Sequence, residues 1–163
     1  MPTPNGYSRT QIRLHWIVAA LILFQLIFGE EIGGAFDAML DSGVANYDLA
    51  AATHILAGVG VLLFGLWRLA LRMTRGVPAA PAGESAAQVL IAKMTHGILY
   101  LAMIAVPVVG LYAWFGGSEE AGDIHGFAKP VFIILVGLHI LGALYNHFVL
   151  KNGLLLRMTR AAD

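Results

Sequence analysis

Six histidines, each within or at the end of a long apolar stretch, are the residues of this sequence best suited to do chemistry. They are His15, His54, His96, His125, His139 and His147. A polar side chain in such surroundings is costly and usually functional, although a histidine can also pack there and hydrogen-bond across helices. The sequence has no cysteine, which excludes thiolate ligands, iron–sulfur clusters and covalently attached haem. Any metal site must therefore depend on histidine.

The spacing of four histidines predicts two sites at different depths. His125 and His139 are 14 residues apart, which in a helix is roughly 21 Å along the axis and within about 40° of the same face. His54 lies near the start of the second apolar stretch, at the depth of His125 if successive helices alternate in direction. His15 similarly matches the depth of His139. We therefore expect an outer pair, His54 with His125, and an inner pair, His15 with His139.

A site with two histidines suits haem better than zinc. Haem brings its own four equatorial nitrogens and accepts two axial histidines, whereas zinc takes four protein ligands, or three and a water molecule. Small residues follow or flank the histidines and leave room for a porphyrin, although they also occur where helices simply pack. They are Ala19, Ala57, Gly58, Gly60, Gly126, Ala128, Gly137 and Gly142. We predict two b haems, each bound by two histidines.

Two arginines are candidates to bind haem propionates. Arg68 lies 14 residues after His54, so it reaches the depth of the inner site on nearly the same helix face. The alternative is an arginine that extends to the lipid headgroups. Arg13 allows the same two interpretations.

Polar residues nearer the inner membrane surface suggest a quinone pocket. His96 and His147 lie on that side, and histidine exchanges protons near neutral pH. With them we group Lys93, Asn146 and Lys151 as candidates to bind and protonate a quinone beside the inner haem. Interfacial histidines without a special role are the alternative. The tryptophans Trp16, Trp67 and Trp114 lie near the ends of the apolar stretches, as in the aromatic belt of membrane proteins.

The elements that position these residues are four membrane-spanning helices. Of the 163 residues, 58% are hydrophobic and 12% charged, a balance typical of a protein solvated by lipid. Four stretches supply the roughly 20 apolar residues that a span requires: about 12–30, 49–71, 90–114 and 124–150. The first has no small-residue cleavage site, so we expect an anchor and no removable signal peptide. The expected fold is an all-α, integral membrane four-helix bundle, with residues 1–163 as one domain.

Charge separates the two sides of this bundle. Most basic residues fall on the side that holds both termini and the 72–89 loop, so the positive-inside rule places both termini in the cytoplasm. They are Arg9, Arg13, Arg68, Arg72, Arg75, Lys93, Lys151, Arg157 and Arg160. The outer side has eight acidic residues against Lys129, a local charge of −7: Glu30, Glu31, Asp37, Asp41, Asp48, Glu119, Glu120 and Asp123. Such loops either follow from topology alone or form a docking surface for a basic redox partner.

Four stretches of sequence together cover most of the chain: YSRTQIRLHW (7–16), THILAGVGVLLFGLWRLALR (53–72), HGILYLAMIAVPVVGL (96–111) and GLHILGALYNHFVLKNGLLLRM (137–158). They resemble the bacterial cytochrome b561 family, relatives of the cytochrome b subunits of nickel–iron hydrogenases and formate dehydrogenases. The resemblance implies a multi-pass protein of the bacterial inner membrane, with His15, His54, His125 and His139 as ligands of two haems. It also implies ubiquinone chemistry at the inner haem, and the family includes superoxide oxidase, which passes electrons from superoxide to ubiquinone.

The leading hypothesis is transmembrane electron transfer through two b haems, between a periplasmic redox partner or superoxide and the membrane quinone pool. Superoxide oxidation would be its enzymatic form, although an outer charge of −7 repels an anionic substrate. One alternative is a membrane anchor subunit that serves a periplasmic redox protein. An alternative of another class is a cofactor-free proton-relay transporter or scaffold. A ferric reductase using Glu30, Glu31 or Asp37 is also conceivable, and no nucleic acid partner is expected.

Overall fold

The computed structural model describes residues 4–162, and the elements found there are all helical. They are α1 (Arg9–Phe28), the 3₁₀ turn η1 (Gly29–Ile32), α2 (Gly33–Ser42), α3 (Leu49–Arg75), α4 (Ala86–Gly116), α5 (Glu119–Phe148) and the 3₁₀ turn η2 (Leu154–Met158). The helices α1, α3, α4 and α5 are long and apolar enough to span a membrane. This confirms the predicted all-α membrane bundle of four spans.

Polar capping residues, not the apolar stretches, decide where the long helices begin. Ser8 before α1 and Ser85 before α4 each form a capping box with the glutamine three residues later. Asp48 before α3 and Ser118 before α5 each accept a hydrogen bond from a first-turn N–H group. Such caps satisfy backbone donors that have no partner within the helix. At their starts, α1, α4 and α5 therefore extend three to five residues beyond the apolar stretches by which the sequence located them, while α3 begins at Leu49 as predicted.

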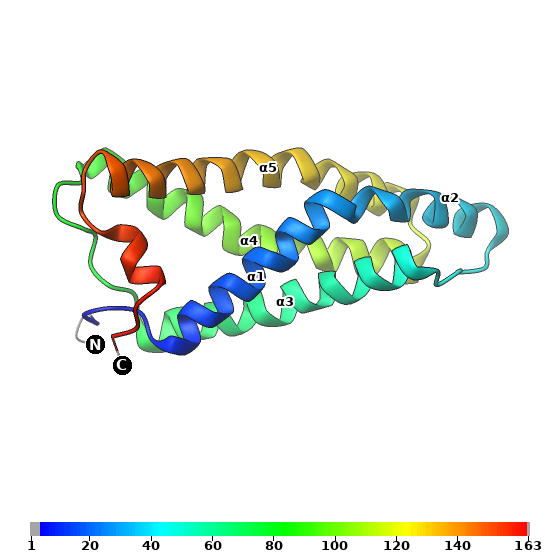
Figure 1. The fold of residues 1–163 in the computed structure, drawn as a ribbon. Helices are drawn as coiled ribbons and strands as arrows, with labels where there is room; N and C mark the ends of the chain where they lie inside the picture. The colour runs from blue at the N-terminus through cyan, green and yellow to red at the C-terminus, as the bar shows by residue number, and fades with distance from the viewer. Residues whose placement is uncertain (1–3, 163) are drawn as a thin grey trace.

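The turn between α4 and α5 is shorter than the gap between the predicted apolar stretches 90–114 and 124–150. Gly117 ends α4 in the left-handed conformation, with φ 61°, a conformation that costs glycine little. Ser118 then caps α5 directly. The two helices are consequently antiparallel neighbours along their length, as Figure 1 shows.

The long helices alternate in direction, so that residues near the two ends of the chain meet at one end of the bundle (Figure 1). The closest helix pairs are α4 with α5, α1 with α3, and α3 with α4. In Figure 1, α1 crosses the bundle diagonally and leads through η1 into α2 at the opposite end. We refer to the end with both termini as the inner end and the end with α2 as the outer end.

Little of the apolar surface is buried between the helices. One small cluster contains Val18, Val61 and Met103, and a second at the outer end contains Met39, Ala51 and Trp114. Large apolar residues such as Leu56 and Leu101 are exposed on the outside. An exterior of this kind is stable only when lipid covers it.

The helix α2 lies between the first two predicted apolar stretches, 12–30 and 49–71, where the sequence indicated no helix. Phe36 and Met39 of α2 pack toward Trp114 of α4, while Asp37 and Asp41 are exposed. Apolar residues three apart form one face of a helix, and this face covers the outer end of the bundle. Trp114 is consequently only 5% exposed, so its assignment to the aromatic belt was wrong. Trp16 and Trp67 are exposed as a belt requires.

The C-terminal segment folds back against the inner end. The Trp16 indole nitrogen donates to the carbonyl of Met158 at 2.8 Å, and Arg157 donates to the carbonyl of Ala79 at 2.6 Å. The Ala162 N–H group donates to the carbonyl of Tyr7 at 3.1 Å. Burial raises the pKa of the Tyr7 phenol above its usual value.

Replacing Trp16 with phenylalanine should loosen this segment while keeping an aromatic ring. A lost neutral hydrogen bond costs about 1 kcal/mol, which corresponds to roughly fivefold more frequent opening. Trypsin should therefore cleave at Arg157 or Arg160 about fivefold faster in W16F than in the wild type. W67F, at a similarly exposed tryptophan of α3, is the control, and equal cleavage rates in all three proteins would contradict the prediction.

Candidate functional site

The outer pair of histidines predicted from depth meets in space. His54 of α3 and His125 of α5 have their ring centres 5.8 Å apart. An imidazole nitrogen bonds a metal ion at about 2.0 Å, so two imidazoles on opposite sides of one ion have ring centres about 6 Å apart. The spacing therefore fits one metal between the two rings.

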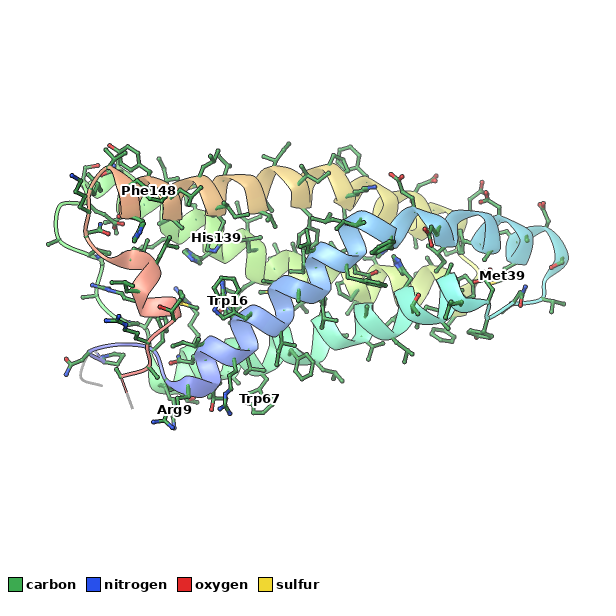
Figure 2. All side chains as sticks on the ribbon, viewed as in Figure 1. Arg9, Trp16, Met39, Trp67, His139 and Phe148 are labelled. Atoms are coloured by element: carbon green, nitrogen blue, oxygen red, sulfur yellow. The ribbon has the colours of Figure 1, made fainter. Side chains whose placement is uncertain are left out.

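The inner pair shows nearly the same spacing. His15 of α1 and His139 of α5 have their ring centres 6.0 Å apart, and in Figure 2 His139 points from α5 toward α1. His96 of α4 lies closer to His139, at 5.0 Å in an edge-to-face arrangement. Its Nδ1 is already hydrogen-bonded to the Ala92 carbonyl at 2.6 Å. The His96–His139 distance is shorter than the roughly 6 Å expected across one metal ion, so the spacing favours His15 over His96 as the second ligand on this side.

Within the described chain, no group of three or more histidine or acidic side chains could hold a metal ion. Zinc and other ions that need three or four protein ligands are poorly served by such pairs. Two-histidine pairs suit a metal that arrives with its own equatorial ligands, as haem does.

A cavity of about 480 Å³ adjoins the outer pair. His54 and His125 both line it, and most of the remaining lining is apolar, including Ile22, Val61 and Phe132. Pockets for organic ligands have volumes in this range and are similarly apolar. The outer site therefore combines two facing imidazoles with space for a flat apolar group.

Two features hold His125 in place. Its Nδ1 is 3.0 Å from the carbonyl oxygen of Val106 on α4, so Nδ1 carries the proton and Nε2 is left to bind a metal. A Cβ on Gly110 would lie only 2.6 Å from Cε1 of this ring. Only glycine therefore permits α4 to approach the imidazole so closely.

His54 is positioned by α1. The Gln25 side-chain amide donates to the carbonyl of His54 at 2.9 Å, and a Cβ on Gly29 would lie 3.4 Å from the ring. Nδ1 of His54 is buried and has no hydrogen-bond partner among the described residues. Buried polar atoms normally have a partner, so an unpartnered nitrogen beside a cavity is consistent with a ligand-binding role.

Arg68 lies at the inner site, as its spacing from His54 predicted. Its guanidinium acts electrostatically on His15, His96 and His139 and lies 5.9 Å from the centre of the Tyr100 ring. Nε and Nη1 of Arg68 are buried without a hydrogen-bond partner in the described chain. A buried cation with unused donors fits an anionic ligand such as a propionate. Arg13, by contrast, is exposed.

The residues grouped as quinone candidates occupy different surroundings. His96 lies beside His139, whereas Asn146 is buried, donates to the Gly142 carbonyl and accepts a hydrogen bond from Asn152. The His147 ring packs on Phe148 with a centre distance of 4.8 Å. Lys93 and Lys151 are exposed. A shared quinone pocket for these residues stays a prediction.

Sequence reasoning missed Gln25, Val106 and Gly110 as groups that position the outer histidines. It also missed that Lys129 pairs with Glu30, with 2.5 Å between Nζ and Oε1. The only available signals were a glycine and a glutamine within apolar stretches. Such residues are common wherever membrane helices pack closely or hydrogen-bond across an interface, so they do not point to a particular histidine.

Comparison with known proteins identifies relatives along the whole chain. Residues 6–161 match the family profile of prokaryotic cytochrome b561. Cytochrome b562 of Cereibacter sphaeroides is 38% identical over 98% of this chain and 99% of its own length. Cytochrome b561 homolog 1 of Escherichia coli is 27% identical, over 94% of this chain and 97% of its own. The probable superoxide oxidase CybB of Yersinia pestis is 28% identical, over 93% and 94%.

Replacing Gly110 with alanine should move the His125 ring out of the outer cavity. Because the relatives are cytochromes, haem content per chain is the direct readout, and we expect G110A to lose about half of it. G97A is the matched control, because Gly97 is also on α4 and a Cβ there would meet nothing within 4 Å. Full haem content in G110A would show that the close approach of α4 is not needed.

Proposed function

The chain belongs to the prokaryotic cytochrome b561 family, and on that premise we propose that it carries electrons across the bacterial inner membrane through two b haems. The outer haem would be held by His54 and His125, and the inner haem by His15 and His139. The inner site would exchange electrons with ubiquinone, and the outer site with a periplasmic redox partner.

The observation that carries this proposal is the repetition of one geometry at two depths. The two pairs have ring-centre distances of 5.8 and 6.0 Å, although their members come from α1, α3 and α5. Both distances are close to the roughly 6 Å expected for two imidazoles on opposite sides of one metal ion, and the two pairs are the ones predicted from depth. The chain belongs to a family of cytochromes and contains no cysteine. Histidine is therefore the favoured haem ligand.

Haem supplies reversible one-electron chemistry when it is bound, and the protein supplies orientation and charge. The Val106 carbonyl fixes the proton on His125, which leaves its other nitrogen as the ligand. Arg68 offers unused donors to a propionate at the inner site. The apolar residues that line most of the outer cavity would limit the access of water to that site.

We place quinone exchange at the inner end because His96 lies against His139 there. Reduction of a quinone consumes protons as well as electrons, and His96 is a suitable proton donor and acceptor. His147 and Asn146 lie farther toward the inner surface on α5, with Lys93 and Lys151 exposed near it. These residues are the candidates for guiding the quinone head group.

The charge of the outer end favours a basic redox protein over superoxide as the outer partner. The outer local charge is −7, and its one lysine, Lys129, is paired with Glu30. A negative surface slows the approach of an anion and speeds that of a cationic protein. Superoxide remains the second candidate, because the relative from Yersinia pestis is named a probable superoxide oxidase.

Haem quantification by the pyridine haemochrome method tests the two-haem proposal. The wild type should contain two b haems per chain, while H125A and H15A should each contain one. H147A should keep both and serves as the control, because its ring packs on Phe148 instead of on another histidine. A wild type without haem would favour the cofactor-free proton-relay or scaffold alternative.

Neutralising α2 distinguishes the two outer partners. Asp37 and Asp41 are both exposed on α2, and D37N/D41N removes two negative charges without removing a helix cap. At low ionic strength, reduction by a basic redox protein should slow several-fold, whereas reduction by superoxide should become faster. E84Q, in the loop at the inner end, should change neither rate. An unchanged rate with the basic protein in D37N/D41N would argue against docking at this surface.

A further inference from the structure

Trp114 carries a hydrogen-bond donor that the protein itself does not use. This residue is only 5% exposed and lines the outer cavity. Its Nε1 is buried and has no hydrogen-bond partner among the described residues. A buried indole N–H normally has an acceptor, so the group that occupies the cavity is expected to provide one.

Lys129 is the second group of interest at this cavity. It lies one helical turn inward of His125 on α5, and its pairing with Glu30, the residue after Gly29 beside His54, brings its ammonium group back toward the outer pair. Among the described residues, it is the only lysine or arginine that lines the cavity. Its side chain is 31% exposed, whereas that of its partner Glu30 is 78% exposed. Both residues line the cavity, and the ammonium group of Lys129 belongs to the more buried member of the pair.

The rest of the cavity offers little to a carboxylate. Toward the middle of the bundle its lining is apolar, with Ile22, Val61 and Phe132. Gln25 adds a buried oxygen without a partner among the described residues, which is an acceptor and cannot bind a carboxylate. An ionised carboxylate buried among such groups is strongly disfavoured.

We propose that the propionates of the outer haem face the outer end of the bundle, where the Trp114 indole N–H and the Lys129 ammonium bind them. This inference rests on the proposed haem at His54 and His125. Both donors then bind a carboxylate that would otherwise lack partners in the cavity. Lys129 interacts with a propionate and with Glu30 at the same time. The haem edge is thereby turned toward the acidic outer surface.

A double variant that keeps the net charge distinguishes a Lys129 that binds a propionate from a Lys129 that pairs only with Glu30. Removing Lys129 from a propionate stabilises the more positive ferric haem, so K129Q should lower the midpoint potential of one haem. E30Q/K129Q keeps the net charge of the wild type. If Lys129 interacts only with Glu30, the double variant should have the wild-type potential; if it binds a propionate, the potential should still be lowered.

Resonance Raman spectroscopy of the propionate bending modes tests the contact directly. One of the two haems should show shifted modes in W114F and in K129Q, while W67F and R160Q should match the wild type. If W114F fails to fold or loses haem, K129Q and the double variant still decide the outcome, because Lys129 is partly exposed.

Two outcomes would overturn the inference in different ways. Two bound haems with unchanged propionate modes in both variants, and a wild-type potential in E30Q/K129Q, would place the propionates elsewhere and leave the proposed function intact. Absence of haem from the wild type would overturn the proposed function and this inference together.

Discussion

The cost of placing imidazoles inside a hydrocarbon layer is the constraint on which the rest of this structure depends. A polar group at that depth is tolerated only with a partner, and the chain places four histidines there as two facing pairs. The partners are arranged by neighbouring helices: a carbonyl of α4 fixes the His125 proton, and α4 can approach only because residue 110 is glycine. Helix packing and the geometry of the histidine pairs are thus determined by the same contacts.

Because the histidine pairs and the outer cavity occupy the interior of the bundle, few apolar side chains are buried between the helices. The two buried clusters each contain three residues, while the outer cavity occupies about 480 Å³ between the helices. In a bilayer, lipid tails are as apolar as a leucine core, so helices gain little from contact with one another through large side chains. A group bound between α1, α3 and α5 would supply contacts that the protein lacks, and its binding would stabilise the folded bundle.

The two ends of the bundle differ in what they can attract. The inner end has Arg68 and Arg72 near Tyr100 and is closed by the C-terminal segment. The outer end has an acidic surface, and α2 covers Trp114 beneath it. Under the proposed function, this asymmetry would draw a cationic redox protein to the outer surface, while Arg68 would bind an anionic propionate at the inner site.

The sequence by itself determined the class of fold, the four spans and the depth of each histidine, because hydropathy and helical rise depend only on local order along the chain. His54 with His125 and His15 with His139 could be paired by depth alone. Depth does not specify which way a side chain points around its helix axis. It also does not specify which of the segments between the spans form helices of their own. The tertiary structure therefore decided that Gly110 lies against His125, that Lys129 meets Glu30 across 99 residues, and that α2 buries Trp114. These contacts depend on the rotation of each helix against its neighbours, which only the packed bundle sets.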